Sequence, residues 1–153
     1  MLKVGERAPE FHALSTAGAE VSLTGFKGRK LVLYFYPKAD TPGCTQESLE
    51  FSALRASFAE AGTEVIGISA DPVKAQDAFK AKHGLTVALG SDPTHAMLKA
   101  YGVWGEKSMY GKTFMGIVRT TFLIGSDGRI LRVWPNVKVK GHAADVLAAA
   151  QTV

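Results

Sequence analysis

The chain has 153 residues, of which 46% are apolar and 21% are charged. This length suits a single domain over residues 1–153, and the balance is typical of a soluble globular protein rather than a disordered one. The formal net charge is +4, from 18 Lys and Arg against 14 Asp and Glu. The basic residues are scattered along the chain, which argues against a dedicated nucleic-acid binder. No apolar run is long enough to span a membrane.

The first residues and the cysteine content bear on the cellular compartment. The chain starts MLKVGERAPEF, with charges and a proline where a signal peptide would need its apolar stretch, so we expect a cytoplasmic protein. There is one cysteine, Cys44. A single cysteine excludes an intramolecular disulfide and a zinc site built on several thiolates.

The first half of the chain alternates between strand-like and helix-like segments. Residues 11–24 predict a small hairpin about Ala17-Gly18. Residues 30–37 (KLVLYFYP) are rich in β-branched and aromatic residues and apolar on both faces, which predicts a central strand covered on both sides. Residues 42–61 have helical spacing of their apolar groups, and residues 63–70 (TEVIGISA) predict a second core strand.

The alternation continues in the second half. Residues 72–83 predict a helix that opens at Pro72 and closes at Gly84. Residues 86–90 predict a short strand, and residues 93–101 a short helix. The segment 102–116 has four glycines and no clear period, so we expect a loop there.

The C-terminal part completes the fold prediction. The sequences RTTFLI and RILRVW flank an Asp-Gly pair, which predicts a hairpin, and residues 141–150 predict an Ala-rich closing helix. The order of elements indicates an α/β fold with a central mixed sheet flanked by helices. In such sheets, functional sites form at the carboxyl ends of the strands, so the segment after residues 30–37 is the first place to search.

That segment places a cysteine at the start of a helix. Thr41 can act as the N-cap and Pro42 as the first helical residue, so Cys44 lies at the third helical position. There the sulfur is close to unpaired backbone N–H groups and the positive end of the helix dipole, which favour thiolate over thiol. Because the thiolate is the nucleophile, this position predicts a reactive cysteine.

Each of these residues also has a purely structural interpretation. Cys44 could be a small buried apolar residue, since many free cysteines are only that. Thr41 could be only a helix cap, and Pro37 could only terminate the strand. The spacing alone leaves these alternatives open.

Pro37, Thr41 and Cys44 form the pattern PxxxTxxC within YFYPKADTPGCTQE. This pattern closely resembles the active-site motif of the peroxiredoxins. The segments VGERAPEF and GVWGEKSMYGKTFMGIVRTTFLIGSDGRI extend the resemblance over nearly the whole chain, to the bacterioferritin comigratory protein (PrxQ) subfamily. The resemblance implies a thioredoxin-like fold of the peroxiredoxin type with an N-terminal β-hairpin. It also implies a thiol-dependent peroxidase that reduces hydrogen peroxide and organic hydroperoxides through a sulfenic acid, in antioxidant defence.

The resemblance also assigns roles to four residues. Cys44 is the peroxidatic nucleophile, Thr41 hydrogen-bonds the peroxide, and Pro37 shields the thiolate. Arg119, in GIVRTTF, stands where the family has an arginine that completes the site. A guanidinium is a permanent cation with several donors, so it can hold the thiolate and stabilise the charge that develops on the peroxide. Glu47 matches a frequent acidic position of the family. It either holds Arg119 or faces water, and we leave it out of the catalytic set.

The chain departs from the family at the resolving cysteine. Many members have it five residues after the peroxidatic cysteine, where this chain has Leu49, and others near residue 80, where it has Lys80. We therefore expect a one-cysteine peroxiredoxin that needs an external thiol reductant: thioredoxin, glutaredoxin or glutathione, or Cys44 of a second subunit. The chain has nothing like the long C-terminal arm of the decameric members, which favours a monomer over a weak dimer.

Other motifs are weaker. Gly111-Lys112-Thr113 lacks the first glycine of a P-loop, because residue 106 is Glu. The four histidines are isolated in sequence, so we expect them to be solvated and predict no metal. We also predict no cofactor, no nucleic-acid partner and no membrane association. The alternative to a peroxidase is a redox-sensing or interaction protein of the thioredoxin fold whose Cys44 does not turn over efficiently.

Overall fold

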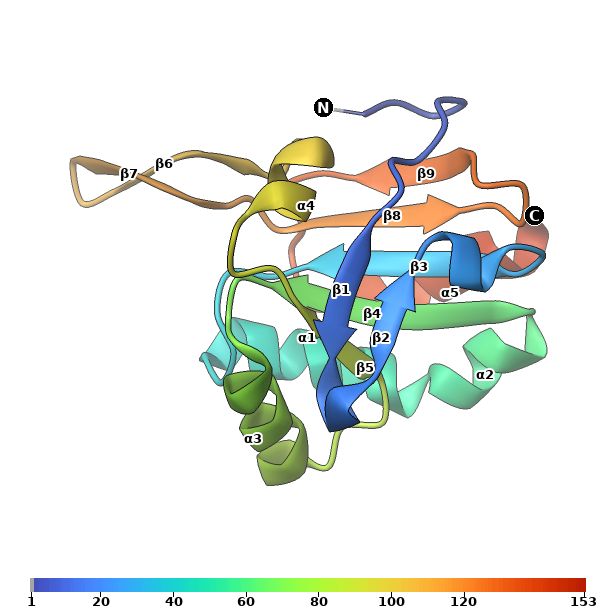
Figure 1. Cartoon of the computed structure of the whole chain (residues 1–153), viewed down its shortest axis with the longest axis horizontal. Coiled ribbons are helices and arrows are strands. Elements are labelled where there is room, and N and C mark those ends of the chain that lie inside the picture. Colours follow the sequence, from blue (N-terminus) through green and yellow to red (C-terminus); the bar gives the residue numbers. More distant parts are fainter. Residues whose placement is uncertain (1) are drawn as a thin grey trace.

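The computed structural model describes residues 2–153, which form a seven-stranded mixed sheet and a separate two-stranded ribbon (Figure 1). The order across the sheet is β2-β1-β5-β4-β3-β8-β9. The bounds of its strands are β1 His12–Ser15, β2 Glu20–Ser22, β3 Lys30–Phe35, β4 Thr63–Ser69, β5 Ala88–Ser91, β8 Thr120–Ile124 and β9 Ile130–Trp134.

Strand β3 lies in the middle of this sheet and determines where the site forms. It is parallel to β4 and antiparallel to β8. Residues Leu31 to Tyr36 are all buried, and alternate side chains enter two different apolar clusters. This pattern confirms the prediction of a strand covered on both faces.

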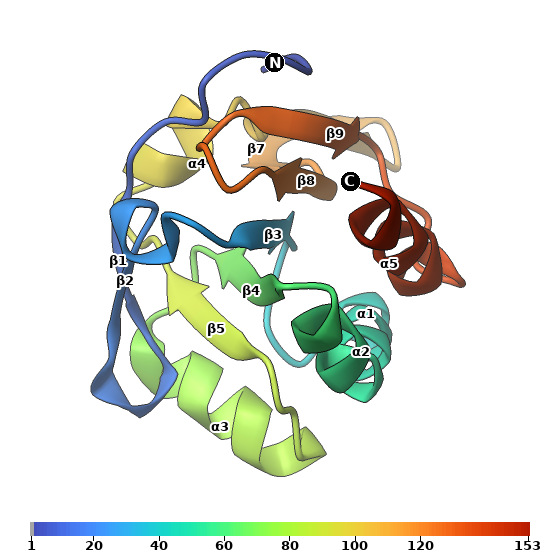
Figure 2. The same cartoon turned by 90° about the vertical axis from the view of Figure 1, so that its right-hand side faces the viewer.

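The helices provide the two covers of the sheet (Figure 2). Four of them contribute buried residues to the cluster that contains Val32, Tyr34 and Tyr36, and α4 packs with the N-terminal segment against the cluster on the opposite face. The helices are α1 Pro42–Ala53, α2 Arg55–Glu60, α3 Val73–His83, α4 Ala96–Ala100 and α5 His142–Thr152, with short 3-10 turns η1 Thr16–Gly18 and η2 Thr24–Phe26. The predicted central mixed sheet, its flanking helices and both hairpins are therefore confirmed.

The single helix predicted over residues 42–61 is wrong, because the chain breaks at Leu54 into α1 and α2. The N–H of Leu54 donates to the carbonyl of Phe51, three residues back, which tightens the turn. At the same place, Thr86 binds Ser52 from outside the helix: its N–H donates to the Ser52 hydroxyl (3.0 Å) and its own hydroxyl donates to the Ser52 carbonyl (3.0 Å). These two bonds tie the end of α1 to the residue before Val87.

The loop predicted over residues 102–116 is also wrong. It forms a ribbon of two antiparallel strands, β6 Trp104–Met109 and β7 Lys112–Ile117, that projects from the body of the protein (Figure 1). Tyr110 and Gly111 form its turn, both with positive φ (53° and 76°), as a two-residue hairpin turn requires. The strands are hard to recognise in the sequence because the ribbon is mostly exposed and its apolar residues do not alternate regularly with polar ones.

Among the helices of residues 2–153, none combines the length and the hydropathy that a membrane span requires.

His142 corrects the expectation of solvated histidines. It begins α5, is only 5% exposed, and shares a hydrogen bond of 2.8 Å with the hydroxyl of Thr121. Its ring packs edge-on against Phe51 and Trp134. Burial lowers the pKa of His142 from 6.5 to about 4.

This pKa predicts a loss of stability in mild acid. Between pH 6.5 and about 4, the unfolded chain protonates His142 and the folded protein does not, so stability falls as pH falls through this window. The full pKa shift corresponds to a decrease of at most about 3 kcal/mol in the free energy of unfolding. The decrease is smaller where solvent screens the charge of the imidazolium. The variant His142→Gln keeps a neutral hydrogen-bonding group and should show a smaller decrease. Urea unfolding at several pH values measures this loss of stability. Equal losses in the wild type and in His142→Gln would contradict the assignment of the effect to His142.

Candidate active site

The site lies where β3 ends and β8 begins. Phe35 pairs with Thr120, so Arg119 lies one residue beyond the paired strands, at the edge where the chain leaves β3 for α1. The carbonyl of Arg119 accepts a hydrogen bond from Val137 N–H (2.9 Å), which holds its backbone from the other side. Antiparallel pairing thus brings two segments about 75 positions apart in the sequence to one edge.

Cys44 is the third residue of α1, as the sequence predicts. Thr41 has extended backbone (φ −92°, ψ 155°), its carbonyl accepts the first helical bond from Thr45 (2.8 Å), and Pro42 follows as the first helical residue. The Cys44 side chain is 1% exposed and belongs to the apolar cluster of Tyr34, Tyr36 and Phe51. The thiol is therefore both at a helix start and protected from bulk water.

The Thr41 hydroxyl does not cap the helix. It donates to the carbonyl of Lys38 at 2.7 Å and closes the turn before α1. Because a hydroxyl has one proton and two lone pairs, this arrangement uses the proton and leaves the oxygen available as an acceptor.

Arg119 connects Cys44 to Glu47. Its Nη2 donates to the Cys44 sulfur at 3.4 Å, and its Nη1 donates to Glu47 Oε1 at 2.7 Å. Arg119 is therefore not a surface arginine: its side chain is 17% exposed. Of the two alternatives for Glu47, the structure has the first, since its carboxyl is 1% exposed and holds Arg119 rather than facing water.

Burial and charge shift the pKa values of Glu47 and Arg119 in opposite directions. Burial raises the pKa of Glu47 to about 7, although the attraction of Arg119 opposes the shift. Burial also acts to lower the pKa of Arg119, but the negative charges of Glu47 and Cys44 outweigh it and raise that pKa overall. Within residues 2–153, the second oxygen of Glu47 has no hydrogen-bond partner. Glu47 is thus committed to Arg119 through one oxygen.

The loop from Pro37 to Thr41 is fixed by two carboxylates. Asp71 Oδ2 accepts a hydrogen bond from Ala39 N–H at 2.8 Å. Asp40 shares hydrogen bonds with His83 Nε2 (2.7 Å) and Lys82 Nζ (2.8 Å), which lower the pKa of Asp40. Pro37 follows the buried Tyr36 and is half-buried at the start of this loop. Asp40, Asp71 and His83 could not be identified from the sequence, because no local pattern shows that the end of β4 and the end of α3 lie beside this loop.

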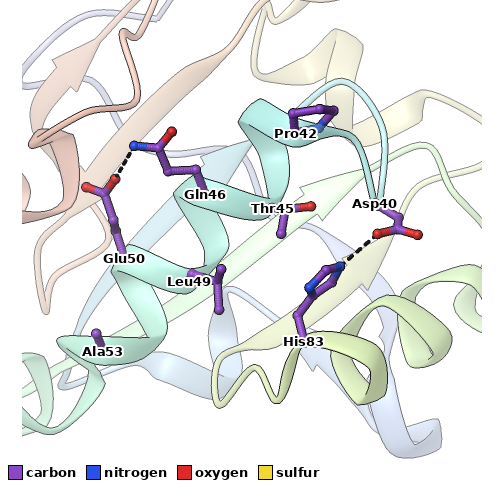
Figure 3. Close-up of a pocket in the computed structure, with 8 residues that line it drawn as sticks. All are labelled: Asp40, Pro42, Thr45, Gln46, Leu49, Glu50, Ala53 and His83. Carbon is purple, nitrogen blue, oxygen red and sulfur yellow. Dashed lines mark hydrogen bonds and ion pairs between the residues drawn. The ribbon is translucent and has the colours of Figure 1, made fainter.

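A groove of about 580 Å³ runs beside α1 and reaches this loop (Figure 3). Its lining is mostly on the outer face of α1, with Asp40 and His83 at one end. Leu49, which stands where the family resemblance implies a resolving cysteine, is 43% exposed in this groove. In the described part of the chain, no three His, Cys, Asp or Glu side chains cluster closely enough to hold a metal ion.

Comparison with known proteins defines the family of this chain. Residues 4–133 match the family model described as AhpC/TSA family. The chain is 42% identical over 146 residues to peroxiredoxin Bcp of Bacillus subtilis, covering 95% of this chain and 93% of the relative. It is 42% identical over 146 residues to peroxiredoxin Bcp of Escherichia coli, covering 95% and 94%.

Solved structures show the same similarity. Peroxiredoxin Q of Xanthomonas campestris has a TM-score of 0.89 at 44% identity, covering 93% of this chain and 90% of that one. A Cys-to-Ser mutant of PrxQ from Xylella fastidiosa has a TM-score of 0.94 at 38% identity, covering 99% and 97%. The chain therefore belongs to the AhpC/TSA family and has its thioredoxin-like fold. Within that family it is a peroxiredoxin of the Bcp/PrxQ type, a thiol-dependent peroxidase.

Proposed function

We propose that Cys44 is the nucleophile that reduces the peroxide. Its thiolate attacks one oxygen of ROOH, the O–O bond breaks, and the other oxygen leaves as ROH after it takes up a proton. Cys44 becomes a sulfenic acid, so the sulfur is oxidised and the peroxide reduced by two electrons. The main support is the 3.4 Å contact between Arg119 Nη2 and the Cys44 sulfur, which keeps a cation beside the reacting atoms.

Arg119 and Thr41 would act on the two oxygens of the peroxide. The guanidinium has donors in a fixed fork, so it can stabilise the thiolate and then the negative charge that builds on the leaving oxygen. The free lone pairs of the Thr41 hydroxyl can accept a hydrogen bond from the peroxide O–H and so orient the peroxide. Pro37, at the start of the same loop, would shield the thiolate from water. Glu47 acts through Arg119 and is a positioning residue.

The substrates that we propose are hydrogen peroxide and organic hydroperoxides. A structural study of the Xanthomonas campestris bacterioferritin comigratory protein concerns its alkyl peroxide reduction activity. This chain is 44% identical to that protein. The proposed mechanism requires only the O–O bond and one terminal hydroxyl, so it does not depend on the group R.

We further propose that an external thiol completes the cycle. The sequence has no second cysteine, so the sulfenic acid must react with a thiol of another molecule: thioredoxin, glutaredoxin or glutathione. Attack by that thiol forms a mixed disulfide and releases water, and a second thiol then frees Cys44. We also propose that residues 1–153 act as one monomeric domain in the cytoplasm, the compartment in which thioredoxin and glutathione keep thiols reduced.

Peroxide consumption with dithiothreitol tests the assignment. Cys44→Ser should abolish turnover because it removes the nucleophile. Thr41→Val keeps the shape of the side chain and should slow turnover roughly a hundredfold, the range of a lost orienting group. Turnover that persists in Cys44→Ser would contradict the mechanism. Wild-type protein that forms the sulfenic acid but does not turn over would support a redox sensor.

Introducing a cysteine at Leu49 tests how Cys44 becomes accessible. On an intact helix, positions 44 and 49 are roughly 8 Å apart at Cα, from the helix rise and radius. This exceeds the limit of about 7 Å for a disulfide. We predict that peroxide drives an intramolecular disulfide in Leu49→Cys, with lower amide protection of residues 43–50, because the first helical turns open at low cost.

The control for this experiment is the double variant Cys44→Ser/Leu49→Cys, in which no intramolecular disulfide can form. Rapid peroxide turnover by Leu49→Cys without a disulfide would show that the start of α1 is rigid. The wild-type protein would then have to present oxidised Cys44 to its reductant in the folded state.

A further inference from the structure

Asp40 has an unusual backbone conformation next to Thr41, the residue that we propose orients the peroxide. It lies directly before Thr41 and has a φ of 61°, in the left-handed region that side chains other than glycine rarely adopt. Asp tolerates this conformation better than most residues, but it still costs free energy unless the surroundings hold it. The chain direction set at Asp40 determines where Thr41 and the first turn of α1 lie.

The Asp40 carboxylate is held by the end of α3. Oδ1 contacts His83 Nε2 at 2.7 Å and Oδ2 contacts Lys82 Nζ at 2.8 Å (Figure 3 shows the His83 contact). A carboxylate at the C-terminal end of a helix faces the negative end of the helix dipole, so without these donors the contact would be unfavourable. The Asp40 carboxylate can lie there because Lys82 and His83, in the last turn of α3, donate hydrogen bonds to it.

The two contacts differ in strength. The Lys82 side chain is 63% exposed, and such surface ion pairs contribute little. The His83 side chain is 23% exposed, and its ring packs edge-on against the buried Phe79 at 5.5 Å. Because His83 is already fixed by this packing, it can hold Asp40 in place at a small further entropic cost.

We infer that the Asp40–His83 hydrogen bond is a positioning device for peroxide reduction: it keeps Asp40 left-handed and thereby fixes Thr41 beside Cys44. The Asp71 carboxylate accepts a hydrogen bond from the N–H of Ala39, the residue before Asp40. Two consecutive loop residues, Ala39 and Asp40, are therefore anchored by side chains from outside the loop. This inference depends on the proposed role of Thr41 in orienting the peroxide. It assigns Asp40 and His83 no contact with the reacting atoms.

The test compares two reactions of Cys44 in single-turnover experiments. Oxidation by hydrogen peroxide depends on the orienting hydroxyl of Thr41, whereas alkylation by iodoacetamide depends only on the thiolate and its access. His83→Phe keeps the ring packing on Phe79 and removes the donor to Asp40. We expect its peroxide rate constant to fall roughly tenfold, as for a small misplacement of an orienting group, with alkylation within about twofold of wild type.

Matched variants separate positioning from a general structural effect. His83→Gln carries an N–H near the place of Nε2 and should recover most of the peroxide rate. Lys82→Met removes the exposed partner and should stay within about twofold of wild type. Asp40→Gly keeps the left-handed backbone accessible but loses the carboxylate, and should slow the peroxide reaction as His83→Phe does. The double variant Asp40→Gly/His83→Phe should be no slower than either single variant, because all three lack the same bond.

Several results would overturn the inference. His83→Phe could react with peroxide at the wild-type rate, or lose both reactions equally, or show an effect that adds to that of Asp40→Gly. Thermal unfolding checks that each variant is folded. If His83→Phe does not fold, the peroxide rate constant of Asp40→Gly tests the inference in its place. A wild-type protein that reacts with peroxide no faster than a free thiol would instead overturn the proposed function itself.

Discussion

The buried ion pair between Glu47 and Arg119 is the interaction on which the site depends. A carboxylate that is 1% exposed is costly unless a cation compensates it, and Arg119 Nη1 lies 2.7 Å from it. The same guanidinium donates to the Cys44 sulfur through its other nitrogen. Removing Glu47 would leave the guanidinium free to turn toward solvent, and removing Arg119 would leave a buried unpaired carboxylate. The pair therefore fixes the direction of the guanidinium N–H that donates to the Cys44 sulfur.

This interaction exists only because the sheet brings α1 and the start of β8 to one edge. Strand β3 is parallel to β4 and antiparallel to β8, so the end of β3 and the start of β8 coincide. Cys44 and Glu47 are three residues apart on α1, which places both on one helix face toward Arg119. The apolar cluster that contains Tyr34, Phe51 and Cys44 keeps water from the pair and strengthens its electrostatics.

The sequence predicts this site better than it predicts the parts around it. Cys44 at the third helical position follows from Thr41-Pro42-Gly43, and Arg119 follows from the family resemblance. Burial of Glu47 and His142 could not be deduced, because each depends on contacts between segments far apart in the sequence. The break at Leu54 lies beside contacts from Thr86, a residue far along the chain, and the apolar residues of the β6–β7 ribbon do not alternate regularly with polar ones, which would reveal its strands. The Asp40–His83 contact likewise appears only when α3 is placed beside the active-site loop.

Single-turnover oxidation of Cys44 by hydrogen peroxide in the variant Arg119→Lys tests the central claim most directly. Lysine keeps the positive charge but has one compact ammonium, so it cannot donate to both Glu47 and Cys44 in the geometry of the fork. The comparison is made above the Glu47 pKa of about 7, where the carboxyl is ionised. The ion-pair account predicts a rate constant lower than wild type by roughly a hundredfold, the size of a lost preorganised donor. A rate constant equal to that of the wild type would show that charge alone suffices and would contradict it.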